Sequence, residues 1–225
     1  MRLTDDPGRF AGALYLLLTI TSLIPFAYVA TLVVPNNPLA TAANVLANET
    51  LFRASIVLEL FAAVIFIVLV LALYRLLGAV NKAYSMLMVA FALVSVPITF
   101  FQGLMQLAAL EFIHGPSFLS IFPPPQMNAV AQVFMDLSGQ VLYLNDVFFG
   151  LWLLPFGVLV YRSGFIPGVL GILLIINGFA YLGYVALLVT PSISTVLAEV
   201  LLIPELVGEL PIMAWLLVKG AKPRP

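Results

Sequence analysis

The sequence has no cysteine, a single histidine and very little charge. Without cysteine the protein has no disulfide, no thiolate nucleophile and no cysteine-ligated metal. His114 alone cannot supply a three-histidine zinc site or a pair of haem ligands. We therefore expect no metal site, no cofactor and no catalytic residue that the sequence can name.

Charged residues make up 8% of the 225 residues, against roughly a quarter in soluble domains. Such a chain cannot cover a surface that faces water, so we expect the lipid bilayer to be its main partner. The near balance of 9 basic and 10 acidic residues also lacks the basic face that nucleic acid requires, and we expect no nucleic-acid partner.

Apolar residues form 63% of the chain, at a mean hydropathy of +1.16. A membrane-spanning segment needs about 20 mostly apolar residues and must be helical, because lipid offers its backbone no hydrogen bonds. The qualifying segments are Phe10–Val34, Leu51–Leu77, Tyr84–Leu110, Val130–Tyr161, Phe165–Thr190 and Thr195–Val218. The sequence thus predicts an all-α, polytopic transmembrane bundle of six helices, forming a single integral membrane domain over residues 1–225. A short interfacial helix is expected at Ala40–Asn48.

The basic residues are distributed asymmetrically between the predicted loops. Arg53 lies on one side of the membrane, and the other eight basic residues lie on the opposite side. Loops rich in Lys and Arg stay in the cytoplasm. The pattern predicts cytoplasmic termini for a protein of the cell membrane.

Two of the predicted helices resemble each other. Aligned without gaps, Gly8–Pro35 and Gly164–Pro191 are identical at twelve of twenty-eight positions. Two readings remain open: a parallel internal repeat, as in many transporters, or chance agreement between two apolar helices.

Acidic and amide side chains are concentrated in the outer half of the predicted bundle. Each buried charge costs roughly 2.5–3.5 kcal/mol at the bilayer centre, so such residues point to function. Their helical spacing predicts polar stripes on five helices that face a common outward-opening, acidic cavity. The candidate cavity residues are Arg53, Glu59, Gln102, Gln106, Asp136, Gln140, Tyr143, Asp146, Asn177, Tyr181, Tyr184, Glu205 and Glu209.

Structural explanations compete with a functional one for several of these residues. Glu49 and Arg53 have the spacing of an ion pair within one helix. Gln102, Gln106 and Asn177 have the chemistry of hydrogen bonds that join helices. His114 is expected in a loop, in contact with water.

The chain resembles an uncharacterised bacterial membrane family, number forty-three eighty-six among the domains of unknown function. The resemblance rests on Gly8-Arg-Phe-Ala-Gly-Ala-Leu-Tyr15, Ala47-Asn-Glu-Thr-Leu-Phe-Arg53 with Glu59, Tyr74-Arg-Leu-Leu-Gly-Ala-Val-Asn81, Phe148-Phe-Gly-Leu-Trp-Leu-Leu-Pro155, Tyr161-Arg-Ser-Gly-Phe165 and Gly208-Glu209. It implies a six-helix membrane fold and no particular activity. The family pattern often has His near Ser138 and Asp in place of Glu59, so this chain departs from it at both positions.

Three hypotheses for function follow. The first is a protein that binds or transports a cation, a proton-coupled solute or a cationic amphipath in the acidic cavity. Six helices are few for a transporter, so a transport function would be expected of a homodimer. The second is a membrane-embedded enzyme that uses the Glu205 and Glu209 carboxylates. The third is an accessory or sensing subunit whose polar groups only specify helix packing.

The predicted topology is testable because the protein has no native cysteine. Two variants each carry one cysteine, either appended after Pro225 or replacing Asn36. The two cysteines should react differently with a membrane-impermeant maleimide in intact cells. We expect the Asn36 position to be labelled, and the C-terminal cysteine only after lysis. Labelling of the C-terminal cysteine in intact cells would contradict both the orientation and the even number of helices.

Overall fold

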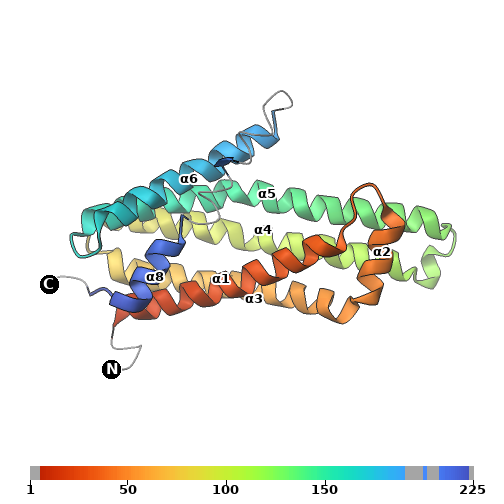
Figure 1. Cartoon of the computed structure of the whole chain (residues 1–225), viewed down its shortest axis with the longest axis horizontal. Coiled ribbons are helices and arrows are strands. Elements are labelled where there is room, and N and C mark those ends of the chain that lie inside the picture. The colour runs from red at the N-terminus through yellow and green to blue at the C-terminus, as the bar shows by residue number, and fades with distance from the viewer. Residues whose placement is uncertain (1–5, 191–199, 202–207, 223–225) are drawn as a thin grey trace. The chain divides into compact units, whose positions relative to one another are not determined.

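The computed structural model describes residues 6–190, 200–201 and 208–222, and within these ranges all regular structure is helical. Figure 1 shows the labelled helices. Their bounds are α1 Pro7–Leu32, α2 Pro38–Ala47, α3 Glu49–Leu77, α4 Lys82–His114, a 3₁₀ turn Ser117–Leu119, α5 Pro124–Ser163, α6 Gly168–Leu188 and α8 Leu210–Lys219.

Five helices, α1, α3, α4, α5 and α6, are long and apolar enough to cross a membrane. They correspond to the first five predicted segments, and α2 corresponds to the predicted interfacial helix. The protein is therefore an α-helical bundle of membrane type. Most of these helices are longer than predicted: α5, with 40 residues, is about 60 Å long, against a hydrocarbon core of roughly 30 Å.

The sixth predicted segment, Thr195–Val218, is only partly described. Residues 195–199 and 202–207 lie outside the described ranges, so a sixth crossing stays a prediction. The structure corrects the prediction of one continuous helix at one point. Gly208 and Glu209 form a bend, and the ten-residue α8 begins after them at Leu210. Pro211 explains this start. Proline suits the first turn of a helix, but it has no N–H to donate to the carbonyl four residues earlier, so it disfavours helix on its N-terminal side.

The chain divides into two compact units. This division does not test the prediction of a single membrane domain, which stays a prediction. Unit 1 comprises residues 1–18, 64–96 and 143–225, and unit 2 comprises residues 19–63 and 97–142. Helices α1, α3, α4 and α5 each contribute residues to both units, whereas α6 and α8 belong to unit 1 and α2 to unit 2.

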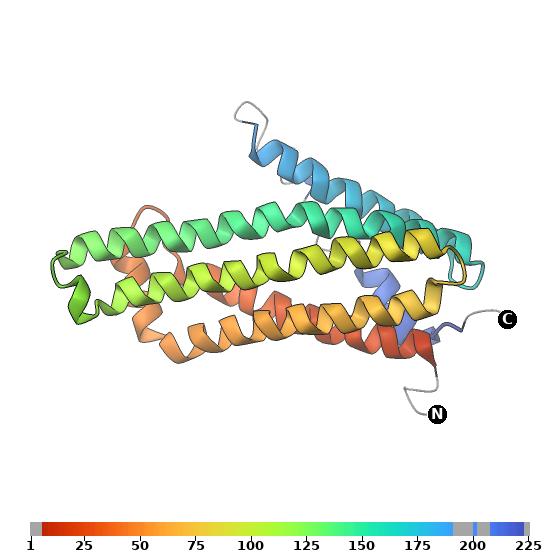
Figure 2. The same ribbon diagram turned by 180° about the vertical axis from the view of Figure 1, so that it is seen from behind.

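In unit 1 the start of α1 and the end of α8 are joined by polar contacts. The Asp6 carboxylate accepts hydrogen bonds from the backbone N–H groups of Gly8, Arg9 and Ala221, each within 3.1 Å. Burial opposes ionisation of this carboxyl, but the three donors and the nearby Lys222 charge hold the pKa of Asp6 below its ordinary value. Figures 1 and 2 both show the red start of α1 beside the blue α8.

Glycine allows α1 and α8 to approach this closely. A Cβ on Gly12 would lie 2.4 Å from the backbone nitrogen of Leu217, and one on Gly8 would lie 2.1 Å from that of Ala221. The Arg9 guanidinium also donates to the Val218 carbonyl at 3.1 Å. The two ends of the chain are thus held together by backbone contact as well as by side chains.

The end of α5 and the whole of α6 form an antiparallel pair built on glycine. Glycine recurs at every seventh position, at residues 150, 157, 164, 171 and 178. The central Gly164 turns the chain at a φ of 68°. Positions equally far from this turn face each other, so Gly157 meets Gly171 and Gly150 meets Gly178. A Cβ on Gly157 would lie 2.6 Å from the Gly171 carbonyl oxygen, and one on Gly171 would lie 2.5 Å from that of Gly157. In lipid no hydrophobic effect drives two helices together. Small residues at such crossings let the backbones approach closely, and the van der Waals contact between them stabilises the pair.

In unit 2, α2 lies against the C-terminal end of α1 and hydrogen-bonds to it. Asn37 caps the first turn of α2 by accepting from the Ala40 N–H at 3.1 Å. The Asn44 amide donates to the Leu32 carbonyl at 3.2 Å, which satisfies one of the last carbonyls of α1. Below this cap, Phe112 and Phe134 stack with their ring centroids 5.6 Å apart and join α4 to α5.

The glycine pair gives a prediction with a control on the same helix. Gly157→Ala forces α5 and α6 apart and should destabilise the protein by about 1–3 kcal/mol, the usual cost of overpacking. Gly139→Ala on α5 meets no atom within 4 Å, so the better helix propensity of alanine should leave stability unchanged or raise it. Thermal unfolding in mild detergent measures both. Equal stability of the two variants would mean that the close crossing contributes nothing.

Candidate functional site

The structure buries a set of polar side chains in each unit. In unit 2 the buried polar residues include Glu59, Gln102, Gln106 and Gln132. In unit 1 they include Ser95, Asn145, Asp146 and Asn177. The predicted cavity residues are thus divided between the two units, and each cluster is described separately.

Glu59 is the buried carboxylate of unit 2. Its side chain is 8% exposed, and Gln102 of α4 directs its amide nitrogen to the carboxylate at 3.5 Å. Gln106, one turn further along α4, also lies near enough to favour the Glu59 charge. The Gln106 carbonyl oxygen is buried and has no hydrogen-bond partner. Glu59 therefore faces neutral amides, and the described residues form no ion pair with it.

Arg53, the candidate counter-charge for Glu59, is engaged elsewhere. Its guanidinium contacts the Glu49 carboxylate at 2.7 Å, and the Arg53 side chain is 51% exposed. His114 also approaches Glu49, at 3.2 Å. His114 was expected in a loop but is the last residue of α4, because the helix continues four residues past the predicted end. The explanation of Arg53 and Glu49 as a pair within one helix is the one that the geometry supports.

The polar stripe predicted on α5 turns away from the buried face. Gln132 is buried and donates to Asp136 at 2.9 Å, but Asp136, Gln140 and Tyr143 are exposed. Residues four apart are about 40° apart around a helix, so a stripe built on that spacing winds around the axis. The buried face instead passes through Met135, Ser138 and Asp146.

Glu209 is the centre of the polar cluster in unit 1. Its carboxylate accepts a hydrogen bond from the Tyr15 hydroxyl of α1 and another from the Asn177 amide of α6 at 3.4 Å. Asn177 is fully buried, and its carbonyl oxygen has no hydrogen-bond partner. Glu209 itself precedes α8, where the positive end of the helix dipole favours an acid.

Aromatic rings surround the Tyr15 side of this cluster. Trp152 of α5 lies 6.2 Å from the Tyr15 ring, and it packs between Phe66 and Phe156 at 5.0 and 5.3 Å. Phe149 lies 6.3 Å from the Tyr181 ring. These rings cover Tyr15, which is 3% exposed, whereas its acceptor Glu209 is half-buried.

The remaining candidates in unit 1 lie on α5 and α6. Tyr143 and Tyr184 form an edge-on ring pair at 5.9 Å, with Tyr184 buried and Tyr143 exposed. Asp146 is buried in α5. Glu205 lies outside the described residues, so its place in the predicted site stays a prediction.

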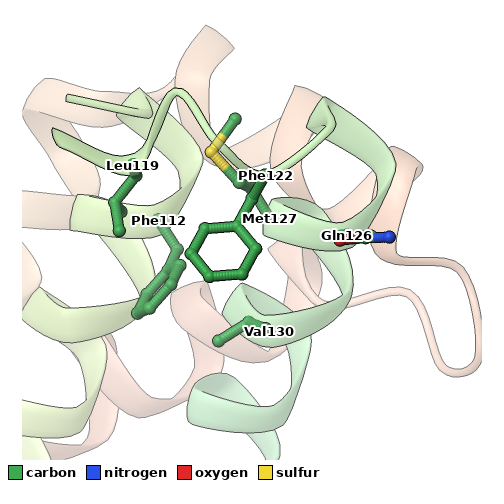
Figure 3. A pocket seen from close by; sticks show the side chains of 6 residues that line it. All are labelled: Phe112, Leu119, Phe122, Gln126, Met127 and Val130. Atoms are coloured by element: carbon green, nitrogen blue, oxygen red, sulfur yellow. The ribbon is translucent and has the colours of Figure 1, made fainter. Parts of the chain in front are cut away.

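A pocket in unit 2 contains none of the thirteen candidates. It has a volume of about 200 Å³ and is lined by Phe112, Leu119, Phe122, Gln126, Met127 and Val130. Figure 3 shows the Phe112 and Phe122 rings facing this space, with the Gln126 amide at its side. The pocket is apolar and differs from the acidic cavity that the sequence predicted.

Within the described ranges, no cluster of three or more His, Cys, Asp or Glu residues is arranged to hold a metal ion. The site residue that sequence reasoning missed is Tyr15. A hydroxyl within a long apolar run was available as a signal, but its partner Glu209 lies 194 residues away. Spacing along one helix cannot reveal such a pair.

Residues 10–220 match the protein family described as a domain of unknown function, DUF4386. The chain belongs to the DUF4386 family. The match confirms the resemblance inferred from the short sequence stretches. No curated protein and no solved structure matched the chain.

Three of the stretches that carry the DUF4386 resemblance meet in unit 1. The stretch that ends at Tyr15, the stretch that contains Trp152 and the pair Gly208-Glu209 supply the hydroxyl, the indole and the carboxylate of one cluster. Segments far apart in the sequence thus build one buried polar site in this DUF4386 protein.

The Tyr15–Glu209 contact should be measurable as a coupling energy. We expect Tyr15→Phe and Glu209→Gln each to destabilise the protein, and the double variant to lose less than the sum of the two. A hydrogen bond to a charged group predicts a coupling of about 1.5–3 kcal/mol. A control cycle that pairs Tyr15→Phe with Glu49→Gln in unit 2 should show additive effects. Additivity in both cycles would mean that the two side chains do not interact.

Proposed function

We propose that this DUF4386 protein is a multi-pass cell-membrane protein that binds a small cation, either a proton or a monovalent ion, at Glu59. The bound cation would serve transport of the cation itself, of a proton-coupled solute or of a cationic amphipath. The observation that carries the proposal is the Glu59 carboxylate, which is buried in an apolar helix among neutral amides.

The energetic argument starts from the cost of an unpaired buried charge. A carboxylate in a membrane helix is unfavourable by a few kcal/mol unless a positive partner or a proton offsets it. Gln102 donates a neutral hydrogen bond and Gln106 lies nearby, which offsets only part of this cost, and Arg53 is held by Glu49. A positive ligand at Glu59 would remove the remaining penalty and would also pair the free carbonyl oxygen of Gln106.

The direction of access follows from the topology proposed for the chain. Eight of the nine basic residues lie on the side of the termini, which we take as cytoplasmic. The hydrogen bond of 3.0 Å between the Gly8 N–H and the Ala221 carbonyl supports termini on one side of the membrane and an even number of crossings. Glu59 would then lie in the outer half, open to ligands from outside the cell.

Carbodiimide labelling tests the proposal at residue resolution. N,N′-dicyclohexylcarbodiimide enters lipid and modifies protonated carboxyl groups, and the modified residue is identified by mass spectrometry. In detergent-purified protein we expect modification at Glu59 that decreases when the pH is raised or when Na⁺ or K⁺ is added in place of choline. Glu49→Gln, a matched substitution on the same helix, should leave this labelling unchanged.

Labelling of Glu59 that ignores both pH and cations, or its absence at every pH, would overturn the proposal. If Glu59→Gln then lowered thermal stability and nothing else, Glu59 would be an interhelical hydrogen-bond partner. That result would favour an accessory or sensing subunit.

A further inference from the structure

We propose a second ligand site, in unit 1, where Glu209, Asn177 and Tyr15 bind one dehydrated monovalent alkali-metal cation. This inference goes beyond the proposed function, because it concerns different residues and names the ligand. The observations that carry it are the bend before α8, the hydrogen bonds at Glu209 and the unpaired oxygen of Asn177.

The bend places a carboxylate directly before the first turn of α8. The sequence predicts a helix through Thr195–Val218, but Gly208 and Glu209 are not helical and α8 starts at Leu210. Residues at a helix end lie outside its regular hydrogen bonding, and transporters use helix ends to bind coupling ions. Glu209 stands at such an end.

The hydrogen bonds of Glu209 suit its carboxylate form. Both of its oxygens accept from a neutral donor, one from the Tyr15 hydroxyl and one from the Asn177 amide. A protonated carboxyl would have to donate its own proton as well. Among the described residues, no lysine, arginine or histidine forms an ion pair with Glu209.

The carbonyl oxygen of Asn177 is the second unsatisfied group of this cluster. It is fully buried without a hydrogen-bond partner, at a cost of about 1–3 kcal/mol. Rotation of the amide breaks only the 3.4 Å hydrogen bond and turns this oxygen toward Glu209, where one cation would contact both the amide oxygen and the carboxylate. A protonated Glu209 would donate to the rotated amide as well, so the comparison of salt with pH separates a metal cation from a proton.

The charge and the ligand atoms set the class of cation. Among the described residues this cluster has one carboxylate, so a divalent ion would leave an unbalanced positive charge at the half-buried Glu209. The ligand atoms that Glu209, Asn177 and Tyr15 offer are all oxygens, and hard cations prefer oxygen. The site therefore suits an ion such as Na⁺ or K⁺.

Binding is measured on purified protein in detergent by two readouts. The protein has two tryptophans, so Trp215→Phe leaves Trp152, whose ring lies 6.2 Å from Tyr15, as the only indole. Chloride salts of Na⁺, K⁺ and choline are compared at one ionic strength. We expect Na⁺ or K⁺, and not choline, to change Trp152 fluorescence in a saturable way and to raise the unfolding temperature at the same concentrations.

Substitutions assign the effect to the site. Glu209→Gln should abolish the cation dependence of Trp152 fluorescence, and Asn177→Leu, which keeps the volume and removes the oxygen, should raise the half-saturating concentration about tenfold or more. Glu49→Gln, at a carboxylate that pairs with Arg53, should leave the fluorescence response at wild-type strength. Trp152 fluorescence reports on Glu209 and carbodiimide labelling reports on Glu59, so failure of this inference and failure of the proposed function are distinguishable.

Three outcomes would overturn the inference. An equal response to choline would show a general salt effect. A response to pH with none to Na⁺ or K⁺ would show that Glu209 takes a proton. A Trp152 fluorescence response to Na⁺ or K⁺ that survives in folded Glu209→Gln protein, as judged by its cooperative unfolding, would place the ion elsewhere.

Discussion

The absence of hydrogen-bond partners in lipid is the constraint on which the rest of this structure depends. Each polar group that the chain carries into the bundle has to be satisfied by the chain itself. Gln102 meets Glu59, Asn145 donates to the Ser95 carbonyl at 3.3 Å, and Tyr15 and Asn177 converge on Glu209. The atoms that find no protein partner, such as the Asn177 and Gln106 carbonyl oxygens, are therefore the informative ones.

Close backbone contact is the second consequence of a lipid solvent. Apolar side chains gain little by leaving lipid for another helix, so packing depends on how near two helices come. The Gly150–Gly178 and Gly157–Gly171 pairs bring α5 and α6 into backbone contact. Gly8 and Gly12 do the same for α1 and α8. At both places glycine provides contact area that larger residues would prevent.

The environments of Gly12 and Gly168 bear on the internal repeat. These two glycines correspond in the alignment of the two similar segments. Gly12 packs on the α8 backbone near Leu217, whereas Gly168 faces the Tyr161 ring near the α5–α6 turn. Equivalent positions thus have different neighbours, which favours chance agreement between apolar helices over a shared structural role.

The sequence by itself determined the class of fold, the family and the places of five long apolar helices, because long apolar runs in lipid have no alternative to the helix. The exact ends of these helices came from the structure, as at α4 and α5. It also located Glu59 and the buried face of α4, since Ser95, Gln102 and Gln106 repeat at helical spacing. Only the tertiary structure separated the buried Gln132 from the exposed Asp136, because the winding of a stripe depends on which side of α5 meets its neighbours. Only the tertiary structure brought Tyr15 to Glu209, because a contact across 194 residues leaves no periodic signal in the sequence around either residue.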